Sequence, residues 1–397
     1  MSVPPLDPTT VGPARRWSIL VVSFLAQAAS AVTAHGPAFL IPALHDRRGL
    51  SLAEAGAVAA APTIGVMVSL IAWGLFVDRH GERLTLLIGL AGTAGFAALA
   101  ATSRSTPVLG ACLFLAGAAA ASTNVASGRV VVGWFPPHRR GLAMGIRQMA
   151  QPVGVGVAAV TIAVLAEQHG VSTALWVPAA AAALAVLLVA AVVLDPPRAS
   201  PRQGQAANPY VGNRYLARIH SVSVLLVVPQ FLAWTFALVW LTDARGWSAG
   251  AAGALVAVAQ ILGALGRIGV GQISDMVGSR MRPLRWVAVA AAVTMGLLGL
   301  TAHLDWSVAV ALMVVATVVT VADNGLAFTA VAESAGPFWS GRALGVQNTA
   351  QFLAASLVPP LAGLGIAEIG YPAVFALGAL FPIIAAPLVP RGDRRTI

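Results

Sequence analysis

The scarcity of charge along this chain restricts it to one broad kind of fold. Only 10% of its 397 residues are charged and 58% are apolar, with a mean hydropathy of +0.83, whereas an average soluble domain is about 25% charged. The apolar residues form long runs, and a helix needs about 20 of them to cross a bilayer. The sequence therefore predicts a polytopic membrane protein with no room for an extramembrane catalytic domain.

Twelve apolar runs are separated by charged or turn-rich breaks. They cover 17–42, 52–76, 84–102, 106–134, 141–166, 172–194, 219–241, 248–273, 284–303, 306–332, 341–366 and 371–389. The stretch 195–218, rich in Pro, Gln, Asn and Arg, is the one long polar connection. We expect it to be a cytoplasmic linker between an N-terminal six-helix bundle (1–194) and a C-terminal one (219–397).

The arginines predict the orientation, because basic loops resist translocation. The chain has 24 arginines and no lysine; with the N-terminus inside, 17 lie in inner connections and four in outer ones. Both termini are then cytoplasmic. The Ala- and Arg-rich composition suggests a bacterium, and hence its cytoplasmic (inner) membrane. The net charge of +10 is explained by this orientation, so the lipid bilayer and not nucleic acid is the expected partner.

The two halves of the sequence repeat each other. Gly, Asp, Gly and Arg recur at a spacing of 197, as Gly74, Asp78, Gly81 and Arg83 and again as Gly271, Asp275, Gly278 and Arg280. A second register, at a spacing of 200, relates the segment 145–151 to 345–351 and Asn124 to Asn324. Two related six-helix halves are typical of transporters built from repeats, with the substrate near the midplane between them.

The segment that begins at Gly74 resembles the G-x-x-x-D-R-x-G-x-R signature of the major facilitator superfamily, and the resemblance extends over essentially the whole chain. It implies an all-α membrane protein of twelve transmembrane helices in two pseudo-symmetric bundles, and secondary active transport by alternating access. It also implies that Asp78 and Arg79 belong to a cytoplasmic latch. The glycines allow a tight turn and close helix approach, and a helix N-terminus or an arginine can hold the aspartate. The second copy has Met276 in place of Arg79, which predicts a weaker or differently partnered latch.

The predicted gate follows from these two copies and one further acid. It comprises Gly74, Asp78, Arg79, Gly81 and Arg83 in the first half, and Gly271, Asp275, Arg280 and Glu333 in the second.

A narrower resemblance lies in the segment 134–146, which is similar to the W-F-P-x-x-R-G-x-A-x-G run of monocarboxylate-, oxalate-, nitrate- and cyanate-type carriers. Arg267 resembles the eighth-helix arginine that several organic-anion carriers use against a substrate carboxylate. No arginine precedes Gly117 in the fourth run, where drug/proton antiporters usually have one. These features favour an anion over a drug as the substrate.

Charged residues inside apolar runs cost several kcal/mol unless they face a cavity or a partner. Arg129, Arg147 and Arg267 against Asp323 and Glu333 leave a net charge of +3 − 2 = +1, which predicts that the arginines bind an anionic group. The alternatives are snorkelling or pairing with an acid for Arg129 and Arg147, and a gate salt bridge for Arg267. Asp323 is the predicted proton carrier, because burial favours its protonated form; the alternative is a structural partner for an internal arginine.

Uncharged polar residues complete the predicted substrate site. Arg147 and Gln151 lie one turn apart, as do Gln347 and Gln351 in the second half. The full predicted set is Arg129, Arg147, Arg267, Asn124, Asn324, Gln151, Gln347, Gln351 and Trp234. The alternative for the amides is a structural one, because such groups also hold membrane helices together at ~1 kcal/mol each.

The sequence thus predicts a proton-coupled symporter of a small organic anion, a carboxylate. The alternative is a proton-driven efflux pump for drugs or amphipathic metabolites. A non-transporting sensor is disfavoured, since only seven residues follow Pro390. No nucleophile, phosphate loop or metal-ligand cluster is visible, and Cys112 is the one cysteine. We therefore expect a monomer that takes no cofactor and catalyses no reaction.

Overall fold

Helices are the one kind of regular structure in the residues that the computed structural model describes, 11–196, 208–212 and 214–393. The predicted all-α membrane fold is confirmed. Of the predicted linker 195–218, residues 197–207 and 213 lie outside the described part of the chain.

The contacts between residues divide the chain into two compact units. Among the described residues, unit 1 comprises 11–135, 149–196 and 336–349, and unit 2 comprises 136–148, 208–335 and 350–393. Each unit thus contains a short segment from the other half of the sequence. The predicted bundles, 1–194 and 219–397, differ from the units by these two exchanged segments.

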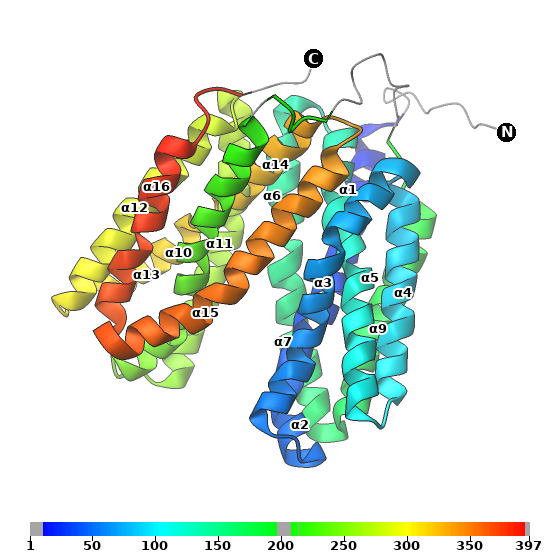
Figure 1. Ribbon diagram of the computed structural model, residues 1–397, viewed down its shortest axis with the longest axis horizontal. Coiled ribbons are helices and arrows are strands. Elements are labelled where there is room, and N and C mark those ends of the chain that lie inside the picture. The colour runs from blue at the N-terminus through cyan, green and yellow to red at the C-terminus, as the bar shows by residue number, and fades with distance from the viewer. Residues whose placement is uncertain (1–10, 197–207, 213, 394–397) are drawn as a thin grey trace. The chain divides into compact units, whose positions relative to one another are not determined.

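Unit 1 is built from long apolar helices that stand side by side. Helix α3 lies along α5, α5 along α4, and α4 along α9, while α1 packs against α5, α7 and α9 (Figure 1). The elements are α1 (Pro13–His35), η2 (Gly36–Leu40), α2 (Ile41–Arg48), α3 (Leu52–His80), α4 (Glu82–Thr102), α5 (Thr106–Trp134), α7 (Ala150–His169), α8 (Val171–Ala174) and α9 (Trp176–Val192).

Unit 2 has the corresponding arrangement. Helix α10 packs against α16, α12 against α13 and α16, and α11 against α6 and α13. The elements are η3 (Pro137–Arg139), α6 (Arg140–Gln148), α10 (Tyr215–Asp243), α11 (Ala249–Val277), α12 (Met281–His303), α13 (Val308–Val319), α14 (Asp323–Ala335), α15 (Ser340–Gly378) and α16 (Leu380–Leu388). The residues of α15 up to Thr349 belong to unit 1.

Eleven helical stretches in the described residues are long and apolar enough to cross a membrane. The last of them, Ser340–Leu388, has 49 residues, about twice what one crossing requires. Gly370 interrupts it with φ 79° and ψ 166°, a left-handed conformation that glycine adopts without steric cost. This break separates the two predicted runs 341–366 and 371–389. With the last stretch divided in this way, the eleven stretches provide twelve membrane crossings.

Two predicted spans are discontinuous in the structure. The fifth is divided at Met149, between α6 and α7. The tenth is divided at 320–322, between α13 and α14, where Ala322 N–H donates to the Val319 carbonyl oxygen at 3.2 Å in a tightened turn. Interrupted helices at membrane depth are tolerated where neighbouring elements satisfy the freed backbone groups. Asp323 begins the second part of the tenth span.

Glycines bring the backbones of α3, α4 and α5 together. A Cβ at Gly117 would lie 2.0 Å from the carbonyl oxygen of Pro62, and one at Gly89 would lie 1.8 Å from Ser122 Oγ. Because lipid tails are as apolar as leucine, close packing over small residues is a main source of helix association in membranes.

We expect Gly117→Val to destabilise unit 1 by about 1–3 kcal/mol, because the added side chain must push α3 away from α5. The measurement is the thermal unfolding of the purified protein in detergent. Gly110→Val is the matched control, since a Cβ at this α5 glycine meets nothing within 4 Å. Equal melting temperatures for the two variants would contradict the packing described.

Candidate functional site

The first signature aspartate binds the start of a helix from the other half of the sequence. Asp78, at the end of α3, accepts hydrogen bonds from Gly341 N–H at 2.8 Å and from Arg342 N–H at 3.0 Å. Arg342 Nε donates to the same carboxylate at 3.0 Å. Both residues lie in the first turn of α15, where unsatisfied N–H groups favour an anion. The Asp78 side chain is 3% exposed.

Arg129 completes the network in unit 1. Its guanidinium pairs with Asp78 and, through Nε at 2.7 Å, with Glu82 at the start of α4. The arginine is 6% exposed and Glu82 is fully buried. The sequence predicted that Arg129 binds substrate, with pairing to an acid as the alternative. The structure shows the alternative, because Arg129 forms salt bridges with two acids.

The other residues of the first signature copy have different surroundings. Arg79 is exposed. Arg83 Nη2 donates to the carbonyl oxygen of Ala190 at 2.8 Å, and its backbone N–H donates to Asp195 Oδ1 at 2.8 Å. Gly81 has a φ angle of 102°, a positive value that glycine adopts without steric cost. Arg83 thus ties α4 to the end of α9.

The second signature aspartate has the same kind of partner in unit 2. Asp275 accepts from the N–H groups of Gly141 and Leu142, at 2.9 Å each, at the start of α6. In the repeat, Gly141 corresponds to Gly341 at a spacing of 200. Met276, which replaces the arginine of the first copy, is 71% exposed.

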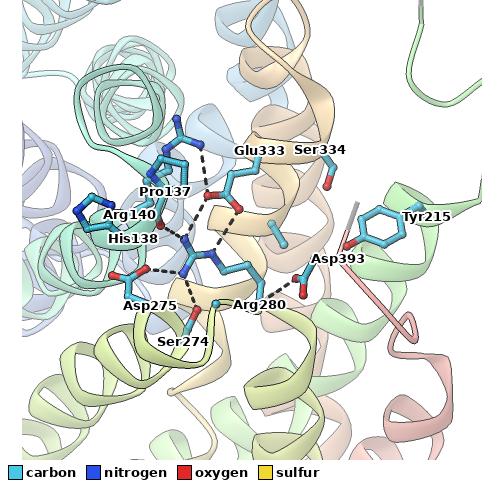
Figure 2. Close-up of a pocket in the computed structure, with 12 residues that line it drawn as sticks. Pro137, His138, Arg140, Tyr215, Ser274, Asp275, Arg280, Glu333, Ser334 and Asp393 are labelled. Atoms are coloured by element: carbon cyan, nitrogen blue, oxygen red, sulfur yellow. Dashed lines mark hydrogen bonds and ion pairs between the residues drawn. The ribbon is translucent and has the colours of Figure 1, made fainter. Parts of the chain in front are cut away.

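Arg280 is the centre of the network in unit 2 (Figure 2). Its guanidinium donates to Asp275 at 2.6 Å, to Glu333 at 3.2 Å and to the Pro137 carbonyl oxygen at 2.6 Å. Arg140 also pairs with Glu333, at 3.4 Å. Burial lowers the pKa of Arg280, but the carboxylates of Glu333 and Asp275 raise it by more, so the pKa lies above its ordinary value and the group stays charged. These residues line a cavity of about 380 Å³.

Paired glycines allow the close approach that both aspartates need. A Cβ at Gly74 would lie 2.5 Å from the Gly341 carbonyl oxygen, and one at Gly341 would lie 2.6 Å from that of Gly74. In unit 2, a Cβ at Gly141 or at Gly271 would lie 2.3 Å from the carbonyl oxygen of the other. The signature glycines therefore act by bringing two helix backbones into contact, as small residues do in membranes.

The two networks combine the same kinds of charged group but take one arginine and the second acid from different positions. In unit 1 the arginine comes from α5 (Arg129) and the second acid from the start of α4 (Glu82). In unit 2 the arginine comes from the turn before α12 (Arg280) and the second acid from α14 (Glu333). These residues are not equivalent in the repeat, because Arg280 corresponds to Arg83, Glu82 to Ser279 and Arg129 to Thr329.

A second group of charges in unit 2 lies within the membrane-spanning helices. Asp323 is fully buried, and no side chain among the described residues donates a hydrogen bond to its carboxylate. Arg267 on α11 interacts with it electrostatically, but no ion pair within 4 Å joins them in the described residues. Arg267 Nη1 donates to the Gln148 carbonyl oxygen at 2.8 Å, while its buried Nε has no partner.

Arg147 belongs to the same unit. It is 2% exposed, its guanidinium lies 5.6 Å from the ring centroid of Phe328 on α14, and it donates to the side chain of Gln148. The segment 136–148 thus brings Arg147 to unit 2, together with Arg267 and Asp323.

An amide cluster joins α10, α14 and α15 in unit 2. Asn324 donates to Gln230 at 3.0 Å, and Gln351 donates to Asn324 at 3.0 Å and to Ser223 at 2.6 Å. Trp234, one turn after Gln230, contacts Phe231 and is half-buried. The predicted amides Asn324 and Gln351 therefore satisfy each other.

Unit 1 has a related amide pair. Gln27 donates to Asn124 at 2.9 Å, and Ser127 donates to Gln27 at 3.3 Å. Gln151 lies 3.2 Å from His35 Nε2. Gln347 is buried in this unit, so the predicted pairs Arg147 with Gln151 and Gln347 with Gln351 are each divided between the two units.

Several residues of these networks were absent from the predicted site: Glu82, Gly141, Arg140, Gln27, Ser223, Gly341, Arg342 and Asp195. The glycines carried a readable signal, because Gly141-x-Ala143-x-Gly145 recurs as Gly341-x-Ala343-x-Gly345. Glu82 and Asp195 gave none, since their partners are 47 and 112 residues away in sequence.

Comparison with known protein sequences agrees with this geometry. The profile of the Major Facilitator Superfamily matches residues 19–359. An uncharacterised MFS-type transporter of Mycobacterium tuberculosis is 48% identical over 387 residues, which are 97% of this chain and 86% of that protein. A gallate transporter of Pseudomonas putida is 27% identical over 157 residues (40% of this chain, 35% of that protein). A hexuronate transporter of Bacillus subtilis is 23% identical over 274 residues (65% and 62%).

Solved structures share the fold. The transporter FucP in its outward conformation aligns with a TM-score of 0.75 at 15% identity, over 93% of this chain and 97% of that one. The proton:xylose symporter XylE gives 0.75 at 16% identity, over 96% and 97%. The narrower likeness to monocarboxylate-type carriers is untested by these relatives and stays a prediction. The chain belongs to the Major Facilitator Superfamily and is a multi-pass membrane transporter, not an enzyme.

Proposed function

We propose that the chain transports a small organic anion, a carboxylate, in symport with protons across the cytoplasmic membrane of a bacterium. Both termini are cytoplasmic in this proposal, because 17 arginines then lie in inner connections and four in outer ones. Basic loops resist translocation. The observation that carries the proposal is a group of three charged side chains in unit 2: the buried Arg147 and Asp323, and the half-buried Arg267.

The positive charges in this part of unit 2 support an anionic substrate. Arg147 and Arg267 against Asp323 leave a net charge of +1 among these three side chains. The unpartnered Nε of Arg267 leaves a donor to bind a carboxylate, and arginine binds carboxylates through two parallel hydrogen bonds. Arg129 is better assigned to the gate, because Asp78 and Glu82 already balance its charge.

Asp323 supports the coupling to protons. A buried carboxylate that receives no side-chain hydrogen bond is stabilised by protonation or by a nearby positive charge. A substrate carboxylate at Arg267 would remove part of the stabilising charge and so favour protonation of Asp323. Substrate and proton would then bind together, which is the requirement for symport.

Two relatives give independent support for the substrate class. Gallate and hexuronate, named for the transporters of Pseudomonas putida and Bacillus subtilis, are both carboxylates. The resemblance covers 40% and 65% of this chain, which favours the class and leaves the compound open.

The signature networks are the proposed gate. Asp78 and Asp275 each hold the first turn of a helix from the other half of the sequence. Transport by alternating access requires such contacts to form and break once in every cycle. The proposed gate keeps the predicted residues and adds Arg129, Arg140, Arg342 and Glu82. Arg79 and Arg83 contribute less, because Arg79 is exposed and Arg83 binds the end of α9 and Asp195.

We expect Arg267→Gln to lose the thermal stabilisation that a transported carboxylate gives the purified protein. A ligand at a hundredfold excess over its dissociation constant stabilises the folded state by about 2.7 kcal/mol. The measurement is the melting temperature across a panel of mono- and dicarboxylates, nitrate, cyanate and lipophilic cations. Arg282→Gln, an exposed arginine on α12, is the control. Stabilisation by lipophilic cations alone would turn the assignment to efflux.

We expect Asp323→Asn to abolish uphill uptake driven by a pH gradient in proteoliposomes while exchange of labelled for unlabelled substrate continues. The amide cannot carry a proton but occupies the same volume. Asp243→Asn, an exposed carboxylate at the end of α10, should accumulate substrate like the parent. Uphill uptake by Asp323→Asn would remove this residue from the coupling mechanism.

We expect Asp275→Asn to lower the initial rate of uptake at least tenfold, because the charge that holds Arg280 and the start of α6 is lost. Rates are compared at equal amounts of monodisperse protein. Asp305→Asn is the control, since Asp305 also pairs with an arginine, Arg245, but is 86% exposed. An unchanged rate for Asp275→Asn would argue against a gating role.

A further inference from the structure

The helices that follow the two signature motifs have no N-cap side chain of their own. The N-cap of α4 is Gly81 and that of α12 is Arg280, and neither provides a side-chain acceptor. The first N–H groups of a helix need an acceptor, and Ser, Thr, Asp or Asn usually supplies it from the N-cap position. Here the acceptor comes from far along the chain.

In unit 2 the acceptor is Asp393, beyond the last helix. Its Oδ1 accepts from the backbone N–H of Arg280 at 2.7 Å and of Met281 at 3.1 Å, and its Oδ2 accepts from Ser279 Oγ. Asp393 also lines the cavity that contains the Arg280 network, as Figure 2 shows. The carboxylate therefore holds the backbone of the residue whose side chain binds Asp275 and Glu333.

Two arginines fix the segment that carries Asp393. Arg285 Nη2 donates to the carbonyl oxygens of Val389 and Pro390 at 3.1 Å each. Arg218 Nε donates to that of Leu388 at 2.9 Å. These bonds hold the end of α16 against α10 and α12. They keep Asp393, three residues after Pro390, beside the turn before α12.

Unit 1 repeats this arrangement with Asp195, which follows α9. Its Oδ1 accepts from Arg83 N–H at 2.8 Å, and Arg83 is the repeat equivalent of Arg280. The spacing from Asp195 to Asp393 is 198, against 197 for the signature residues. A Cβ at Gly81 would lie 2.8 Å from Asp195 Oδ1, so the signature glycine also leaves room for this carboxylate.

We propose that Asp195 and Asp393 are positioning residues of the gate, each capping from outside the helix that follows the signature motif in its unit. Asp393 acts through the backbone of Arg280, which it keeps in register with Asp275 and Glu333. The gating role of that network rests on the proposed function. The cap itself requires an acceptor oxygen at this place and not a negative charge, since asparagine caps helices about as well as aspartate.

The test uses the full chain in detergent and needs no substrate. In a Cys112→Ser background, Ala330→Cys places a thiol in the lining of the cavity, where Ala330 is 2% exposed. Its rate of alkylation by N-ethylmaleimide reports how often the cavity opens. We expect Asp393→Ala to raise this rate at least threefold and Asp393→Asn to keep it within a factor of two of the parent. Arg391→Ala, an exposed neighbour, should leave it unchanged.

The proposal would be overturned by an unchanged rate in Asp393→Ala, or by a rate in Asp393→Asn as high as in Asp393→Ala. If Asp393→Ala is too unstable to purify, Ser279→Ala removes one of the three donors and should raise the rate by a smaller factor. An unchanged rate there would overturn the proposal too. For Asp195 we expect the melting temperature of Asp195→Ala to fall and that of Asp195→Asn to stay near the parent. Because alkylation needs no transport, failure of the anion proposal would leave this result unaffected.

Discussion

A carboxylate at the start of a helix is the interaction on which the rest of this structure depends. Asp78 binds the first turn of α15 and Asp275 the first turn of α6. In each case the bound helix comes from the other half of the sequence, and paired glycines let the two backbones meet. The exchange of segments between the two units follows from these contacts. In each network the arginines balance the charges of the aspartate and of the second acid.

The repeat has kept this interaction while changing its supporting residues. Each network contains two arginines and two acids, but Arg129 and Glu82 of unit 1 have no charged counterpart at the equivalent positions of unit 2, Thr329 and Ser279. A change of one partner alone would have left a buried charge uncompensated, at a cost of several kcal/mol. The equivalent residues Arg129 and Thr329 accordingly differ in their partners: Arg129 pairs with Asp78 and Glu82, whereas Thr329 donates to the carbonyl oxygen of Gly325.

The sequence predicted the membrane fold and the twelve runs because hydropathy is a local signal, and the two signature aspartates because their segments repeat at a spacing of 197. It could not predict that Arg129 is satisfied by Glu82, since that ion pair depends on how α4 packs against α5. The break at 320–322 was also unpredicted, because Thr, Val and Ala fit an apolar helix as well as an interrupted one. The caps by Asp195 and Asp393 were missed for a similar reason: each acid lies in a polar segment far from its helix.

The central functional claim is that a carboxylate and a proton bind together in unit 2, at Arg267 and Asp323. The most direct measurement is the pH change when a stabilising carboxylate is added to the purified protein in weakly buffered detergent solution near neutral pH. The account predicts net uptake of protons, approaching one for each carboxylate bound, and none in Asp323→Asn. Proton release on binding, or binding with no pH change in the parent protein, would contradict it.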